Sequence, residues 1–363
     1  MKKIVVALCA LATVGIVACK KDNPTPTPEP TPSQGQRDLR EGVYDPGCKI
    51  VRVSYSNDDA PETWLWDSGT GRLSSVNDDD MCGGYTERIG FAYRTDGRVD
   101  NVNMSNISLG DLMPDVSLSG TMHVDYSGEY ISSLTVSSEG TQVLAAQVQH
   151  NNAKKVSGAS IDLSDNMLVD IFNSMLAGFL VDSTGSSDNL EVSVDEVSGN
   201  VAFAWDGDNV SQATLHIGFR VTTTVGTLVN LVGEDNLGMF GDYGSTLSLL
   251  ASMFPNQPLY FNISVGDTVS YTYDNQVNPF RNYLGRVHIS ALTANNVLSE
   301  QHTGSAGISI STSYAGQNMQ LYQTSYPLPL NPVAYDYLEY NASGCPLRVM
   351  DNDGKETYYQ YAE

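Results

Sequence analysis

The segment FAYRTDGRVDNV, residues 91–102, contains the pattern that decides the fold. It begins with alternating aromatic residues, reaches the turn pair Asp96-Gly97, and resumes with Val99 and Val102, two apolar residues three positions apart. Aromatic and β-branched residues in alternation suit a pleated strand, and an Asp-Gly pair supplies the positive φ that a tight hairpin needs. The segment therefore predicts a β-hairpin.

The same pattern recurs along the chain. Its copies occupy residues 64–76, 91–102, 124–134, 148–156, 203–213 and 338–349, and residues 271–274 and 358–361 keep only the strand half. Hairpins in series form an antiparallel meander, and the irregular spacing of the copies excludes a solenoid or propeller of fixed period. We therefore expect a mainly β fold in which the meander forms a curved or barrel-like sheet.

Two segments break the strand pattern and predict helices packed on this sheet. The first, at about 163–182, has two adjacent apolar rows at i,i+4 spacing, with Asp162 or Ser164 as N-cap and Gly185 beyond its end. The rows are Met167, Ile171, Met175 and Phe179, and Leu168, Phe172, Leu176 and Leu180. The second is shorter, over 245–254, and stops at Pro255. Its expected buried residues are Leu247, Leu250, Met253 and Phe254.

The first 19 residues, MKKIVVALCALATVGIVAC, have the organisation of a secretory signal. Two lysines precede an apolar run, residues 4–17, which is shorter than the about 20 residues of a membrane-spanning helix. The closing tetrapeptide, residues 16–19, resembles the lipobox of bacterial lipoproteins, in which the cysteine is acylated. We predict a signal peptide over 1–18 and lipid attachment at Cys19, which anchors the protein to a membrane. An ordinary cleaved signal is the alternative.

A spacer and one domain follow. Residues 19–37 contain proline at every second position from Pro24 to Pro32, which favours an extended polyproline II tether. No Pro/Gly-rich linker appears later, so we expect a single β-rich domain over 38–363. An alternative boundary lies at 183–189.

The charge balance excludes one class of partner. The 363 residues include 42 Asp and Glu against 19 Lys and Arg, a formal charge of -23. Removing the signal peptide takes away Lys2 and Lys3, which brings the net charge to about -25. Nucleic-acid binding requires clustered bases that displace counterions, so we expect no nucleic-acid partner.

Three cysteines remain after lipidation: Cys48, Cys82 and Cys345. An exported chain meets an oxidising compartment, so a disulfide among them is expected, with one thiol left over. All three pairings remain open. Three buried free thiols are the alternative, and the wide spacing does not form a CxxC redox or zinc motif.

The chain offers few residues for chemistry, and we predict no catalytic set, metal site or cofactor. The histidines, at 123, 150, 216, 288 and 302, are scattered and read as packed or surface strand residues. The acidic clusters, at 57–59, 77–80, 206–208 and 351–354, lack the bidentate Glu that ends a calcium loop, so solvated turns are favoured over calcium. Trp64, Trp66 and Trp205 suit either a core or a sugar-binding platform, and the core is favoured.

Several of these features together resemble a family. The lipobox, the spacer, the hairpins, the segment YDNQVNPF (273–280) with LTANNV (292–297), and the closing region 340–361 resemble Bacteroidetes-type outer-membrane lipoproteins of unknown function with weak YD-like hairpin repeats. The resemblance implies a largely antiparallel domain and brings no catalytic residues. This chain departs from the family over 162–270. Residues 182–184 and 267–269 also resemble O-glycan acceptor sites of such bacteria.

Together these observations predict a non-enzymatic lipoprotein of the outer membrane, facing the periplasm or the cell surface, with a binding or structural role. One alternative is a carrier of an apolar ligand between sheet and helix. The other is a glycan-binding module. The sequence does not identify ligand-binding residues.

Overall fold

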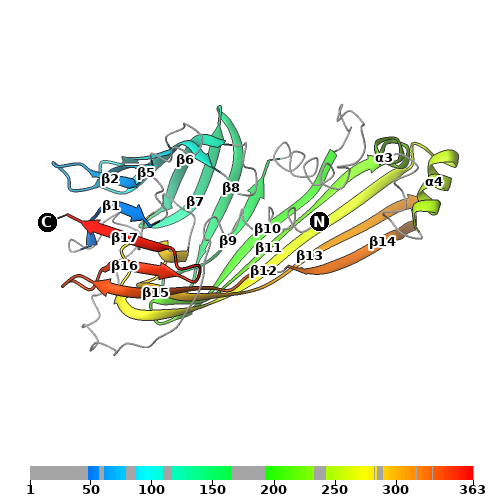
Figure 1. Ribbon diagram of the computed structural model, residues 1–363. Coiled ribbons are helices and arrows are strands. Elements are labelled where there is room, and N and C mark those ends of the chain that lie inside the picture. The colour runs from blue at the N-terminus through cyan, green and yellow to red at the C-terminus, as the bar shows by residue number, and fades with distance from the viewer. Residues whose placement is uncertain are drawn as a thin grey trace.

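The computed structural model describes residues 48–56, 61–78, 87–108, 117–164, 193–232, 243–281, 283, 289–314, 317–328 and 330–362. Within them the structure is antiparallel β with two α-helices (Figure 1). The first nine strands are β1 (Ile50–Tyr55), β2 (Glu62–Trp66), β3 (Leu73–Asp78), β4 (Glu87–Tyr93), β5 (Val99–Ser108), β6 (Ser117–Ser127), β7 (Tyr130–Ser138), β8 (Thr141–His150) and β9 (Val156–Leu163). The others are β10 (Ser193–Asp206), β11 (Asn209–Thr224), β12 (Pro258–Val277), β13 (Asn295–Tyr314), β14 (Gln317–Leu328), β15 (Val333–Tyr340), β16 (Pro346–Asp351) and β17 (Glu356–Tyr361).

The strands close into a barrel. Each strand from β1 to β13 pairs with the next one in the chain, β13 also pairs with β15, and β17 returns to pair with β1. The ring therefore has 16 strands, and the expected barrel-like meander is confirmed. Among the described strands, β14 pairs with β13 alone. Strands β10 to β14 continue past the ring toward the helices (Figure 1).

All six predicted hairpins form, and their turns lie at the same end of the ring, which we call the closed end. Gly97 and Gly344 take positive φ, 93° and 79°, in the turns of the two clearest copies. The opposite end, which carries the helices α3 (Val225–Val232) and α4 (Tyr243–Met253), is the open end.

An aromatic belt at the closed end explains why the motif recurs. In each case the last aromatic residue of a strand donates a hydrogen bond to a backbone carbonyl oxygen at the start of another strand. That strand is the second strand of the preceding hairpin, or β1 in the case of Trp66. The pairs are Trp66 with Ile50, Tyr93 with Leu73, Tyr126 with Val99, Trp205 with Val156, and Tyr273 with Val210, at 2.6 to 2.9 Å. In the first four pairs, the residue just before the acceptor is a Lys or Arg, and its cation lies over the aromatic ring of the donor. These residues are Lys49, Arg72, Arg98 and Lys155. The motif thus joins each hairpin to its neighbour.

Two aromatic residues from the connection between β12 and β13 pack against the wall at the closed end. Phe280 and Tyr283 insert among wall aromatics, with ring centroids 6.1 and 4.7 Å from that of Trp64. Asn278 holds this connection in place by donating to the carbonyl oxygens of Ser290 and Thr293 at 2.6 and 3.0 Å. A short 3-10 helix, η4 (Ile289–Ala291), follows before β13.

The helix predictions met different outcomes. Helix α4 confirms the one predicted at 245–254, with Leu247 buried, but Met253 and Phe254 are 60% and 36% exposed. Their predicted burial is wrong because Met253 is the last residue of α4 and Phe254 follows it, past the part of α4 that packs on the core. Helix α3 was not predicted. Its run of threonine and valine resembles the strand before it, and the hydroxyl of Thr224 caps its first turn.

The predicted start of the helix at about 163–182 is wrong. Leu163 belongs to strand β9, and the amide of Ser164 still bonds the carbonyl oxygen of Val143 on β8. The remainder of that segment lies outside the described residues. Among the described residues, no helix is long and apolar enough to span a membrane.

Candidate functional site

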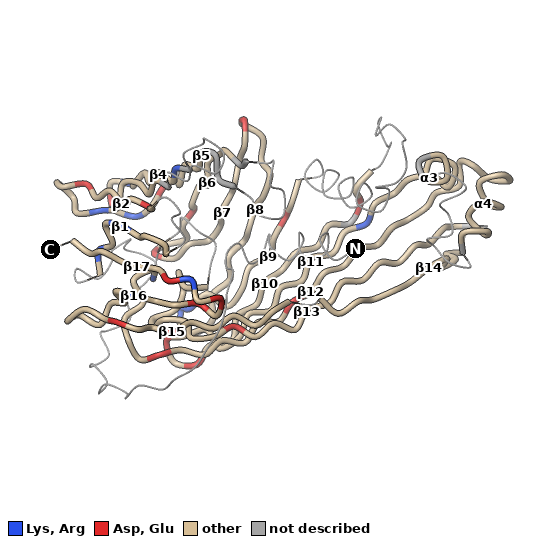
Figure 2. Tube along the Cα trace, in the orientation of Figure 1, with Lys and Arg blue, Asp and Glu red and all other residues tan. Residues whose placement is uncertain are grey.

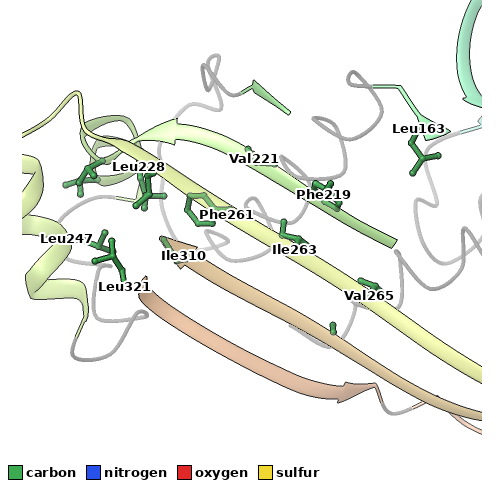
Figure 3. Close-up of a cluster of buried hydrophobic side chains, with 14 of the residues drawn as sticks. Leu163, Phe219, Val221, Leu228, Leu247, Phe261, Ile263, Val265, Ile310 and Leu321 are labelled. Atoms are coloured by element: carbon green, nitrogen blue, oxygen red, sulfur yellow. The ribbon is translucent and has the colours of Figure 1, made fainter. Parts of the chain in front are cut away.

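The inner face of the barrel changes character along its length. On β12, every second residue from the open end inward is buried: Leu259, Phe261, Ile263, Val265, Asp267 and Val269. Strands β11 and β13 present matching apolar side chains in register, including Phe219, Val221 and Ile310 (Figure 3). On β12 the apolar row is therefore interrupted by one acidic residue, Asp267.

The outer face of the same strands is polar. Its residues include Thr214, Thr222, Asn262, Ser264, Thr268, Ser270, Thr303, Ser305, Ser309 and Ser311. A barrel that crosses a membrane has the opposite alternation, with apolar residues outside and polar residues inside. This part of the wall thus keeps its apolar surface inside.

Asp267 belongs to a buried polar cluster with Glu300 and His302 of β13. The Nδ1 atom of His302 lies 2.7 Å from Oδ2 of Asp267, and its Nε2 atom lies 3.8 Å from Oε2 of Glu300. The three side chains are only 2% to 8% exposed. Glu300 and His302 share the inner face because residues two apart on a strand point to the same side. Register then places Val269, the inner neighbour of Asp267, opposite His302.

The electrostatics of the cluster favour positive charge. The hydrogen bond to Asp267 raises the pKa of His302, and the nearby Glu300 carboxylate acts in the same direction. Burial raises the pKa of Tyr271 and of Tyr335 above its usual range, and the charge of Glu300 adds to both shifts. These two hydroxyls therefore stay protonated.

Two polar atoms near the cluster have unused hydrogen-bonding capacity. Oδ1 of Asp267 and the hydroxyl of Tyr335 are buried and have no hydrogen-bond partner. Because a buried polar atom without a partner is costly, such atoms mark places where a ligand, ion or water can bind. The cluster can hold a positive charge or a proton. The described residues contain no group of three or more His, Cys, Asp or Glu side chains arranged for a metal ion.

The open end carries an uncharged apolar rim. Its exposed large side chains are Leu249 and Met253 on α4, Phe254 just after α4, and Met319 near the start of β14, each at least 36% exposed. Gln257, just after α4, bonds the carbonyl oxygen of Ser313, which pairs with Asn318 beside Met319. Residues 243–266 and 303–335 contain no Asp, Glu, Lys or Arg. Figure 2 shows the charged residues gathered toward the closed end.

The residues singled out from the sequence are dispersed. A disulfide joins Cys48, just before β1, to Cys345 in the β15–β16 turn, whereas Cys19 and Cys82 lie outside the described residues. Trp64 is 3% exposed in the core, and Trp66 and Trp205 are half-buried in the belt, each donating its indole N–H to a carbonyl oxygen. The three tryptophans do not form an exposed row.

The other histidines and acidic turns have local partners. His123 contacts Asn101 and Asp125, the ring of His150 lies beside Tyr130, and His216 is exposed on the outer face. His288 lies outside the described residues. Two of the acidic clusters, 206–208 and 351–354, lie wholly within the described residues. In the first, Asp208 pairs with Lys155 at 2.9 Å, and in the second, Asp351 accepts hydrogen bonds from the backbone amides of its own turn. These carboxylates therefore stabilise hairpins.

Sequence reasoning missed the buried cluster. Glu300 and His302 carried a usable signal, because two titratable residues at period two on a strand point to one face. Asp267 carried none, because it lies 35 residues from His302. Only the register between β12 and β13 brings them together.

Comparison with known proteins gives limited results. No family model matches this sequence, and no curated protein matches it. One similar solved structure is a porin-like protein from Bacteroides vulgatus ATCC 8482, at 9% identity and a TM-score of 0.27, covering 86% of this chain and 98% of that one. Another is TcdB2-TccC3-TEV, at 8% identity and a TM-score of 0.24, covering 84% of this chain and 15% of that one. Neither is similar enough for its properties to be transferred.

Proposed function

We propose that this protein is an exported lipoprotein, attached through Cys19 to the outer membrane, that takes up an apolar ligand through the open end of its barrel. The role is binding, and the protein is not an enzyme. This choice favours the carrier among the functions expected from the sequence. The observation that carries it is the exposed apolar rim, which is continuous with the buried apolar rows of β11 to β13.

The two ends of the barrel differ in a way that supports this proposal. Phe280 and Tyr283 pack against Trp64 at the closed end, and the aromatic belt joins its hairpins by hydrogen bonds. The open end has exposed methionine, leucine and phenylalanine side chains, and the segments that carry them, within 243–266 and 303–335, contain no charged residue. Apolar surface left exposed in this way marks a site for an apolar partner or ligand. Entry through the open end follows.

The position of the tether fits the same arrangement. Cys48, the first described residue, lies at the closed end and is held by its disulfide to Cys345. A polyproline spacer rises about 3.1 Å per residue, so the predicted spacer spans some tens of ångströms. In this proposal the closed end faces the membrane and the open end faces away from it.

Photolabelling with an octanol that carries a diazirine tests the proposal in the full-length protein in its own membrane. We expect labelled residues on the inner face of β11 to β14, with Met319→Glu reducing labelling because it places a carboxylate on the rim. Gln320→Glu is the matched control, because it adds the same charge one residue away on the outer face. Labelling confined to outer-face residues, or unaffected by Met319→Glu, would contradict the proposal.

A further inference from the structure

We propose that a second copy of this chain pairs with the edge strand β14, so that two molecules join through an antiparallel contact between their β14 strands. This interaction adds a partner to the proposed function, and it depends on neither the ligand nor the orientation of the tether. It follows from the exposure of β14, from the lack of charge in its segment, and from the symmetry of such a pair.

The side chains of β14 are exposed on the same face where those of β13 are buried. Met319 is 45% exposed, and Thr312, opposite it on β13, is 1% exposed. Tyr326 is 40% exposed, and Ala306, opposite it, is 8% exposed. Alternate residues of an antiparallel strand turn their N–H and C=O groups away from the neighbouring strand, so β14 carries a row of them on its far side. A partner strand would pair with this row and cover both side chains.

The distribution of charge makes this edge the place where two copies can approach each other. The chain has a formal charge of -23, so its charged surfaces repel those of another copy. Residues 303–335, which include all of β14, contain no Asp, Glu, Lys or Arg. Charged residues are a common means by which natural edge strands avoid pairing with another chain. Pro327 lacks an N–H, but as the next-to-last residue of β14 it leaves the strand before it able to pair.

The composition of β14 suits pairing with itself. In a two-fold symmetric contact the same surface meets on both molecules, so each side chain must tolerate its own counterpart. Apart from Met319, Leu321, Pro327 and Leu328, every residue of β14 is Gln, Asn, Ser, Thr or Tyr, which can both donate and accept hydrogen bonds. A two-fold axis at residue 323 or 324, near the middle of β14, places the two copies of Gln323 opposite or diagonal to each other, within about 8 Å.

Complementary charges at Gln323 test the pairing. The full-length protein in an uncharged detergent is examined by sedimentation equilibrium as the unmodified chain, as Gln323→Lys and as Gln323→Glu. We expect the unmodified protein to form dimers and each variant alone to form fewer, because like charges would meet across the two-fold axis. An equimolar mixture of the two variants should associate about tenfold more tightly than either alone, because opposite charges then meet.

The mixture separates this contact from a general effect of charge. Gln323→Lys makes the net charge one unit less negative, and Gln323→Glu makes it one unit more negative. Repulsion between whole molecules would therefore place the mixture between the two variants, whereas pairing through β14 places it above both. Gln301→Lys and Gln301→Glu, the same changes at an exposed position of β13, are the matched controls. Each of them, and their mixture, should associate as the unmodified protein does.

A carbodiimide, which joins an amine directly to a carboxylate, locates the contact in the mixture. Mass spectrometry should find position 323 of one copy linked to position 323 of the other. An unchanged urea unfolding midpoint shows that each variant is folded.

Three results would overturn the proposal. The first is an unmodified protein that stays monomeric at every concentration, which would exclude a second copy as the partner of β14. The second is a dimer that neither variant weakens, which would place the contact elsewhere. The third is a mixture that associates no more tightly than Gln323→Lys alone. None of them bears on photolabelling of the inner face, so the proposed function stands or falls separately.

Discussion

At the scale of single residues, His302 is a titratable side chain that is only 8% exposed. It lies inside the ring with its imidazole between two carboxylates, and its Nδ1 atom is bonded to Asp267. The apolar rows begin immediately beyond it. Such a residue links the protonation state of the barrel interior to its stability, whether or not a ligand is bound.

We predict that His302 makes stability decline with rising pH. Its pKa in the folded protein lies above the ordinary value of 6.5, because Asp267 holds its proton. The stabilisation is therefore fully present below about pH 6.5, and it is lost as the pH rises through the folded pKa. Urea unfolding of the native protein and of His302→Gln, from about pH 6 to about pH 9, measures this. The native curve should fall relative to that of the variant.

The exposed His216 provides the control for this measurement. His216→Gln should unfold with the same pH dependence as the native protein. Parallel curves for the native protein and His302→Gln would show that His302 is not the group responsible.

Single residues also show what the sequence could reveal. The turn glycines Gly97 and Gly344 and the belt aromatics Tyr93 and Tyr126 were visible because each belongs to a hairpin pattern of alternating aromatics and turn residues within a few positions. The bond from Tyr93 to the carbonyl oxygen of Leu73 was not visible, because it crosses from one hairpin to the previous one. Local patterns thus identified the hairpins, and the contacts between hairpins needed the register.

At the scale of elements, β14 is exceptional because it has a neighbour on one side only among the described strands. It is 12 residues long, most of its side chains are exposed, and it contains no charged residue. Edge strands are usually protected by lysine, proline or a bulge, because an open edge pairs readily with another chain. Here Pro327 and one irregularity at Ile310/Ser311 are the protection present.

We predict that a charge on this edge reduces self-association. Gln323→Lys places a lysine on the exposed outer side of β14 and should lower light scattering at high protein concentration. Its free energy of unfolding should change by no more than about 0.5 kcal/mol, as for other exposed sites. Gln301→Lys, on the outer face of the inner strand β13, is the matched control. Equal scattering by the two variants would show that the edge of β14 does not associate.

Helices were the least predictable elements. The prediction for α4 succeeded because Pro255 marks its end and Leu247 with Leu250 supply helical spacing. Helix α3 escaped notice because its Val-Gly-Thr-Leu-Val-Asn-Leu-Val sequence suits a buried strand equally well. What makes it a helix is its packing beside α4 and the cap from Thr224, and neither is readable from composition.

At the scale of the whole molecule, the ring is closed by residues from opposite ends of the chain. Strand β1 pairs with β17, so that Val53 lies opposite Tyr359. The Cys48–Cys345 bond spans a sequence separation of 297 residues and fastens the same region. The sequence predicted a barrel-like sheet, but the seam where it closes requires the three-dimensional register.

We predict that this disulfide contributes substantially to stability. Replacing both cysteines, as Cys48→Ser with Cys345→Ser, should lower the free energy of unfolding by about 3 to 5 kcal/mol, because the bond restricts a very long loop in the unfolded chain. Urea unfolding measures the change. Cys82→Ser, which leaves the bond intact, is the control. An unchanged midpoint in the double variant would contradict this account.

The same bond determines how the molecule carries a mechanical load. If the protein is anchored through Cys19 as proposed, a pull on the spacer would reach the barrel at Cys48, immediately before β1, which is the strand that such a pull would otherwise peel from the ring. The bond would pass this force directly to the β15–β16 hairpin, so the pairing between β1 and β17 would not carry it alone. With the proposed tether, the disulfide would keep β1 from being pulled out of the ring. Reduction of one bond would convert a firm attachment into a strand that can be pulled free.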